Sequence, residues 1–172
     1  DQTQDSAGSK FTQSETSSAF NETTGTLCAS WNDSYSGVTL GTGYSGFGRS
    51  TDGGVTFTDR GDFPTVNYGD PSLVWRKSDG KFYYAALSST GGLVLYRSDD
   101  DCLNFVQVGA ISSTGNDDKE IMTVDNNPSS PYYGRLYVAW TDFTDGRINL
   151  RKSSNGGTTW DAAIDISASD AG

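Results

Sequence analysis

The sequence has 172 residues, of which 12 are basic and 22 acidic, so the formal net charge is −10, and it contains no His. The missing histidine excludes Ser-His-Asp and Cys-His catalysis and histidine metal ligands, and the negative charge argues against nucleic acid as a partner, because phosphate binding needs clustered Lys and Arg. No stretch approaches the roughly 20 apolar residues that span a bilayer, so no membrane span is predicted.

Residues 1–14 precede the first repeat and form an N-terminal extension. They begin Asp-Gln-Thr-Gln, with neither Met nor the apolar core of a signal peptide. We therefore expect an extracellular protein whose signal peptide has already been removed. The extension is a candidate for a strand exchanged with a neighbouring molecule, since donated strands are a common mode of assembly.

Three segments share a Ser, an acidic or amide turn residue and an aromatic residue, and they start at Ser50, Ser98 and Ser153. The first fits the pattern S-x-D-x-G-x-T-[FW] throughout, and the other two depart from it at one or two positions. The Ser and Asp side chains can bond turn amides, the Gly accepts a positive φ, and the aromatic packs back onto its sheet, so a structural role is predicted. The box residues are Ser50, Asp52, Gly54, Thr56, Phe57, Ser98, Asp100, Phe105, Ser153, Asn155, Gly157, Thr159 and Trp160.

Each box ends a longer repeat of apolar-polar alternation broken by Gly, Asp and Asn, which is typical of antiparallel hairpins. The repeats run over about 15–62, 70–110 and 120–163, and each accommodates four short strands. Four-stranded units that recur every 40 to 55 residues or so are typical of propeller blades. The predicted fold is all-β, with three four-stranded antiparallel blades over 15–172.

The boxes resemble the Asp-box (BNR) repeats of sialidase-like β-propellers, and the phrases Tyr68-Gly-Asp-Pro71 and Gly134-Arg-Leu-Tyr-Val-Ala-Trp-Thr-Asp142 resemble bacterial secreted members of that group. The resemblance covers nearly the whole chain after residue 14. It implies that each box lies between the third and fourth strands of a blade. For an active sialidase it also implies three Arg, a Tyr nucleophile assisted by Glu, and an Asp acid/base. No arginine triad can be identified, so no catalytic residue is assigned.

Three acids, Glu15, Asp70 and Glu120, open the three repeats just before the innermost strand, where they would face the mouth of a propeller channel. A ring of carboxylates could bind Ca²⁺, which prefers oxygen ligands, and this is the only cofactor considered. The alternative, which we favour, is that each acid bonds the amides at the start of its own strand.

Cys28 lies on a second strand and Cys102 replaces a box Gly, and an exported chain permits a disulfide between them. A buried free thiol is the alternative for Cys28. Two sequons, Asn21-Glu-Thr23 and Asn32-Asp-Ser34, are glycosylation candidates if the source organism glycosylates exported proteins.

Three blades cannot close a ring, because closed propellers have about four to eight. The open arc could be completed as half of a six-bladed ring of two copies, within a larger parent chain, or by stacking of copies into an open assembly. We expect a secreted, non-enzymatic module that acts in extracellular self-assembly, as a fibre, surface layer or oligomer, and in glycan binding. Its expected partners are other copies of itself and glycans. The alternative is a sialidase-like exo-glycoside hydrolase, or a fragment of one.

Overall fold

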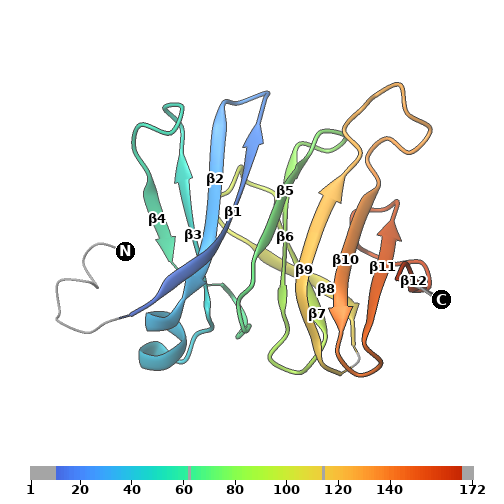
Figure 1. The fold of residues 1–172 in the computed structure, drawn as a ribbon. Helices are drawn as coiled ribbons and strands as arrows, with labels where there is room; N and C mark the ends of the chain where they lie inside the picture. Colours follow the sequence, from blue (N-terminus) through green and yellow to red (C-terminus); the bar gives the residue numbers. More distant parts are fainter. Residues whose placement is uncertain (1–10, 62, 114, 168–172) are drawn as a thin grey trace.

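The computed structural model describes residues 11–61, 63–113 and 115–167, which form three four-stranded antiparallel sheets (Figure 1). Blade 1 contains β1 (Gln13–Asn21), β2 (Thr26–Asp33), β3 (Ser45–Ser50) and β4 (Thr58–Gly61). Blade 2 contains β5 (Ser72–Arg76), β6 (Lys81–Leu87), β7 (Leu93–Ser98) and β8 (Val106–Ser112). Blade 3 contains β9 (Asp117–Val124), β10 (Leu136–Asp142), β11 (Arg147–Ser153) and β12 (Ile164–Asp165). The predicted fold class is confirmed.

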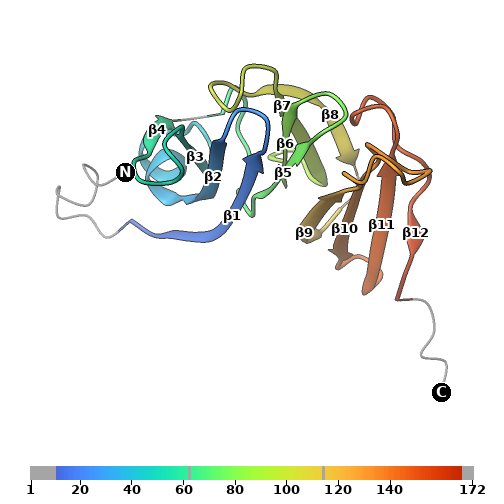
Figure 2. The same ribbon diagram turned by 90° about the horizontal axis from the view of Figure 1, so that it is seen from above.

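The three blades lie side by side along an arc, with the first strand of each blade on its inner side (Figure 2). β1 contacts β5, and β5 contacts β9. Because successive strands are antiparallel, the β1–β2 and β3–β4 turns lie at one end of blade 1, and the β2–β3 loop and the link to blade 2 lie at the other. The same holds for blades 2 and 3, so the box turns share one end of the arc.

Side-chain alternation along the strands explains how the blades pack. In β10, Leu136, Val138 and Trp140 are buried and their neighbours are only half-buried, as expected for a sheet with one covered face. In β6, by contrast, five successive residues are buried, because blade 2 is covered on both faces. One core lies between blades 1 and 2, and a second lies between blades 2 and 3.

The link between blades 1 and 2 contributes to the first of these cores. The Phe63 ring lies 4.3 Å from that of Tyr84 and 5.2 Å from those of Phe47 and Phe105, measured between centroids. Such tilted and edge-on aromatic pairs add about 0.5–1.5 kcal/mol each beyond the area they bury. The link is therefore part of the core and does not behave as a free linker.

The box turns share one hydrogen-bond pattern. In the first, Ser50 Oγ donates to Asp52 Oδ1 at 2.7 Å and accepts the Gly54 amide at 2.9 Å, and Asp52 Oδ1 accepts the Thr56 amide at 3.0 Å. Equivalent bonds form in the second box around Ser98 and Asp100. In the third box, Ser153 and Asn155 make them with an amide oxygen in place of the carboxylate.

The backbone of each box turn needs a positive φ at the position of the box Gly. φ is 88° at Gly54, 64° at Cys102 and 80° at Gly157. The aromatic residue of the second box, Phe105, is buried in the core between blades 1 and 2, and Trp160 of the third packs against the core between blades 2 and 3. The aromatic residues of the second and third boxes thus pack against the preceding blade.

Phe57, the aromatic residue of the first box, differs from the prediction that the box aromatic packs back onto its sheet. It is 48% exposed, because the described residues contain no blade before blade 1. The N-terminal extension lies largely outside the described residues, which begin at Phe11. Its last two residues, Gln13 and Ser14, pair with Asp33 and Asn32 inside blade 1.

A single π-helical turn, η1 (Ser36–Leu40), interrupts the β2–β3 loop and has no counterpart among the predicted elements. Asp33 begins it, since its carboxylate accepts the amides of Tyr35 and Ser36 and the Ser36 hydroxyl. Local side-chain bonds of this kind favour a turn over continued strand.

The structural role of the first box can be tested at Asp52, which accepts the bonds of this turn. Hydrogen bonds from Thr56 and Ser50 hold the pKa of Asp52 well below its usual range. Asp52→Ala removes the acceptor for the turn amides and should lower the melting temperature by about 3 °C. Asp52→Asn reproduces the third box and should lose less than half of that. Calorimetry that finds Asp52→Ala as stable as the parent chain would contradict the role.

Candidate functional site

A groove of about 270 Å³ lies on the inner side of the arc, where the first strands of the three blades begin. Each blade contributes three consecutive residues to its lining, namely 15–17, 70–72 and 119–121. This is the end opposite the box turns. The groove corresponds to the predicted channel mouth, and it contains Glu15, Asp70 and Glu120.

Strand register shows which of these residues are equivalent. The first-strand residues Ser17, Ser72 and Ile121 each pair with the same repeat position of the second strand, occupied by Ser30, Ala85 and Ala139. Two residues earlier stand Glu15, Asp70 and Lys119. Their φ angles are 52°, 55° and 53°, a conformation rare for residues other than Gly.

The expectation that Glu120 occupies the same position as Glu15 and Asp70 is therefore wrong by one residue. Lys119 occupies it, and its ammonium group forms an ion pair with Glu15. The expected ring of three carboxylates is replaced by two acids and a cation. Among the described residues, no group of three or more Asp, Glu, Cys or His side chains is placed to hold a metal ion, so the Ca²⁺ site is also corrected.

Glu120 lies instead on the buried side of β9. It is only 3% exposed, and neither carboxylate oxygen has a hydrogen-bond partner among the described residues. Burial raises the pKa of Glu120 to about 8, and the nearby Asp70 and Asp118 add to the rise. Glu120 is thus largely protonated at neutral pH, a state in which a carboxyl group can donate a hydrogen bond.

Arginine is missing from the described lining of this groove, where Lys119 is the basic residue. Several arginines form ion pairs outside the groove. Arg97 pairs with Asp99, Arg76 with Asp79, and Arg147 with Asp145 and Asp165. The groove therefore does not present the three arginines that the sialidase resemblance implies for a sugar carboxylate.

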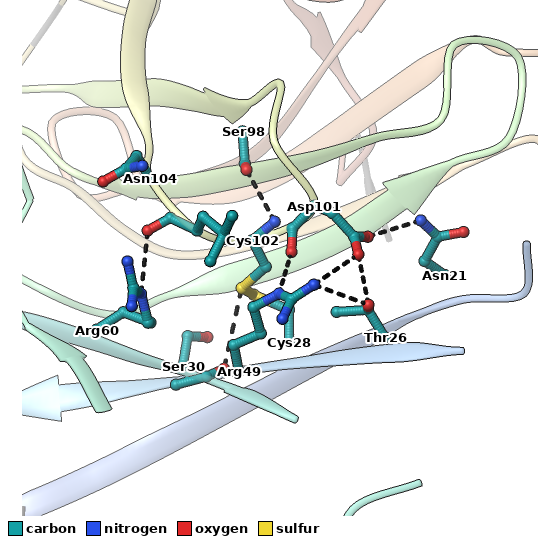
Figure 3. Close-up of a disulfide and its surroundings, with 12 residues drawn as sticks. Asn21, Thr26, Cys28, Ser30, Arg49, Arg60, Ser98, Asp101, Cys102 and Asn104 are labelled. Carbon is teal, nitrogen blue, oxygen red and sulfur yellow. Dashed lines mark hydrogen bonds and ion pairs between the residues drawn. A yellow bond between two sulfur atoms is a disulfide. The ribbon is translucent and has the colours of Figure 1, made fainter. Parts of the chain in front are cut away.

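Blades 1 and 2 are joined covalently by a disulfide between Cys28 of β2 and Cys102 of the second box turn (Figure 3). The Cα atoms are 6.0 Å apart, the two residues are 74 apart in the sequence, and both side chains are fully buried. Closing a loop of this length in the unfolded chain stabilises the folded state by about 4 kcal/mol on the chain-entropy account.

Asp101, next to this disulfide, connects the second box to blade 1 (Figure 3). Its carboxylate accepts bonds from Asn21 Nδ2 at 2.8 Å, Thr26 Oγ1 at 2.5 Å and Arg49 Nη2 at 2.9 Å. Arg49 Nε also donates to the Asp101 carbonyl. Burial alone would raise the pKa of Asp101, but the bonds from Thr26, Asn21 and Arg49 hold it below its usual value.

Both candidate glycosylation sites are engaged in contacts between blades. Asn21 is 3% exposed and donates its Nδ2 to Asp101. Asn32 donates its Nδ2 to Asp70 at 2.9 Å and accepts the Asp70 amide at 2.6 Å. Because Nδ2 is the atom that carries an N-linked glycan, a glycan on either residue would replace these contacts between blades, and glycosylation of the two sequons stays a prediction.

Sequence reasoning missed Lys119, Asp101 and these two asparagines. Lys119 directly precedes Glu120 in the sequence. An alignment of the repeats with a gap of one residue would have placed Lys119, and not Glu120, opposite Glu15 and Asp70. Asp101 belongs to the acidic run Asp99-Asp100-Asp101, a pattern that is typical of a solvated turn. Its role depends on its neighbour Cys102, since the disulfide brings this turn against blade 1.

The burial of Glu120 leads to a pH dependence. Its folded pKa of about 8 exceeds the ordinary 4.5, so folding takes up a proton between these two values. The associated stability is fully present below pH 4.5 and is lost as the pH rises through 8, by an amount on the order of 5 kcal/mol.

Glu120→Gln should therefore unfold in urea with a free energy that changes much less between about pH 5 and about pH 8.5 than that of the parent chain. The control is Glu22→Gln, which changes an exposed glutamate paired with Lys77 and should keep the parent's pH dependence. An unchanged pH dependence in Glu120→Gln would show that Glu120 is ionised in the folded protein.

The solved structures that share this fold include several glycoside hydrolases. An α-L-arabinofuranosidase of Fusarium graminearum aligns with a TM-score of 0.66 and 14% identity, over 89% of this chain and 48% of the enzyme. An α-L-arabinanase of Penicillium chrysogenum aligns with a TM-score of 0.68 and 17% identity, over 89% and 49%. A Hadza microbial sialidase aligns with a TM-score of 0.62 and 15% identity, over 90% and 34%.

No family model and no curated protein matches the chain. In residues 11–61, 63–113 and 115–167, no helix is long and apolar enough to cross a membrane. The chain spans about half the length of the two arabinan-degrading enzymes. At these identities the likeness concerns the fold: the chain forms an arc of a sialidase-like β-propeller.

Proposed function

We propose that this chain is an extracellular, non-enzymatic, glycan-binding half of a six-bladed propeller, and that a second copy completes the ring. The observation that carries the proposal is that both outer faces of the arc repeat faces that are buried inside it. The disulfide supports an extracellular location, because disulfides persist in oxidising compartments.

The free face of blade 3 carries a row of four apolar residues that pair directly across its strands, Ile121, Ala139, Leu150 and Ile164. The equivalent row of blade 2 includes Ala85 and Leu95, which are fully buried against blade 3. In blade 3, Ile121 is 65% exposed and Ile164 is 47% exposed. The free face of blade 3 is therefore equivalent to the face of blade 2 that packs against the next blade.

The free face of blade 1 carries the complementary set. Phe20 and Phe57 occupy the positions of Trp75 and Phe105 in blade 2, which are each 5% exposed and packed against blade 1. Trp31 occupies the position of Trp140, which is buried against blade 2. Phe20, at 52%, is instead largely exposed.

Blade 1 of a second copy thus fits the free face of blade 3 in the same way as blades 2 and 3 fit their predecessors. Two such head-to-tail contacts related by a two-fold axis give a closed ring of six blades. Exposed apolar faces of this kind are rare in monomers, since covering them releases bound water and is favourable. The chain covers 48% and 49% of the two arabinan-degrading enzymes, and this share agrees with half a ring.

The channel-mouth groove is the candidate glycan site of this ring. It offers a cation in Lys119, a carboxyl group in Asp70 and an apolar surface in Ile121, and the protonated carboxyl of Glu120 lies buried beneath them. Sugars are bound by such combinations of hydrogen-bonding groups and apolar area. The lack of arginine in the described lining favours a neutral glycan over a sialoside.

Self-association is tested by multi-angle light scattering after size-exclusion chromatography at micromolar concentration. We expect about twice the chain mass of 18.4 kDa. Leu150→Asp places a charge in the row on blade 3 and should give the single-chain mass. The control Val55→Asp changes a residue that is 81% exposed at the tip of a box turn and should leave the dimer intact. A parent chain that remains monomeric would contradict the proposal.

A glycoside hydrolase is the second candidate, because Glu120 supplies a protonated carboxyl and Asp70 a second carboxyl group in one groove. Arabinobiose, β-1,3-galactan and a sialoside are offered to the dimer, with calorimetry for binding and sugar analysis for cleavage. We expect binding without cleavage, weakened about tenfold by Lys119→Gln but not by the control Lys77→Gln. Turnover abolished by Glu120→Gln would instead establish the enzyme, and absence of both binding and cleavage would refute a glycan role.

A further inference from the structure

A second cavity, of about 90 Å³, lies at the box-turn end of the arc, between the outer strands of blade 1 and the second box turn. It is lined by Arg49, Thr51, Thr56, Thr58, Arg60 and Leu103. A water molecule occupies roughly 30 Å³ in the liquid, so the space exceeds that of one water and suits a small polyatomic ion. It is separate from the channel mouth, which lies at the opposite end of the blades.

Strand register gathers both arginines on one face of blade 1. Arg49 of β3 pairs directly with Thr58 of β4, so their side chains lie on the same side of the sheet. Arg60 follows Thr58 by two residues and shares that side. In Figure 3 both arginines extend from blade 1 toward the second box turn.

The loop of blade 2 holds each guanidinium by its Nε atom. Arg49 Nε donates to the Asp101 carbonyl at 2.6 Å, and Arg60 Nε donates to the Leu103 carbonyl at 3.2 Å. A guanidinium has five N–H donors. Within the described part of the chain, Arg60 donates a hydrogen bond from Nε alone. The N–H groups of its two terminal nitrogens are therefore available to a ligand.

Arg49 and Arg60 are the charged residues of the cavity lining, and the carboxylates of Asp101 and Asp52 lie beside it. Arg49 is paired with Asp101 at 2.9 Å, whereas Arg60 has no ion pair among the described residues. Of the threonines, Thr56 donates its hydroxyl to Asp52. Thr51 and Thr58 make no side-chain hydrogen bond to any described residue, so their hydroxyls are available as donors.

The geometry points to a binding site for a tetrahedral oxyanion, a sulfate or phosphate group, held by the terminal nitrogens of Arg60 with the hydroxyls of Thr58 and Thr51. Guanidinium groups match such anions because two parallel N–H bonds reach two oxygens. The backbone carbonyls of blade 2 hold both arginines in place, so little side-chain freedom is lost on binding. The anion is either a free ion or an ester group on a glycan.

The purified protein is titrated with sodium sulfate up to about 10 mM, at an ionic strength kept constant with sodium chloride, and its melting temperature is followed. We expect a rise of about 3 °C, as for a ligand well above its dissociation constant. Arg60→Gln and Thr58→Val should each lose at least half of the rise. Arg135→Gln, which removes one positive charge near Tyr132 of blade 3, should retain it.

Sulfate also stabilises proteins generally by exclusion from their surface. An equal rise in Arg60→Gln and the parent chain would therefore mean that no site exists and would overturn the inference, as would no rise at all. Sulfated dextran and its unsulfated parent distinguish the sources. Binding of the sulfated polymer weakened tenfold by Arg60→Gln assigns the site to sulfate esters, and binding of the free ion alone assigns it to inorganic sulfate or phosphate.

Discussion

The packing of each blade against its predecessor is the interaction on which the rest of this structure depends. A blade of short strands broken by Gly and Asp turns has little core of its own, and its apolar residues point to both sides. In β6 this leads to burial on both faces, with Phe82 and Tyr84 in one core and Tyr83 and Ala85 in the other. Stability therefore comes from interfaces between blades, as in other repeat proteins.

Polar and covalent contacts set the angle between the blades. Cys28–Cys102 and the bonds of Asp101 join blades 1 and 2 at the box-turn end, and Asn32 and Asp70 join them at the other end. Between blades 2 and 3, Arg76 Nε donates to the Gly134 carbonyl at 2.5 Å. The same contacts bring the starts of β1, β5 and β9 together, and this creates the channel-mouth groove.

The repeat pattern was sufficient to predict the fold, because the box turns and strand alternation are local features. The groove was predicted only in outline. Glu15 and Asp70 recur in the sequence, but the register of β9 is set by pairing with β10 and by a positive φ at Lys119. The repeat pattern alone does not show that the alignment needs a gap of one residue before Glu120. The contact of Asn21 was not predictable for a similar reason: its burial depends on Asp101 of blade 2, which is distant in sequence.

The proposed ring requires that the two free faces of the arc complement each other and close on a second copy. Small-angle X-ray scattering of the purified chain tests this directly, because a closed pair of 172-residue chains is compact. For the closed ring we expect a radius of gyration of about 20 Å that does not change with concentration. A radius that grows steadily with concentration would show open head-to-tail stacking, and one of about 16 Å would show an isolated arc; either would contradict it.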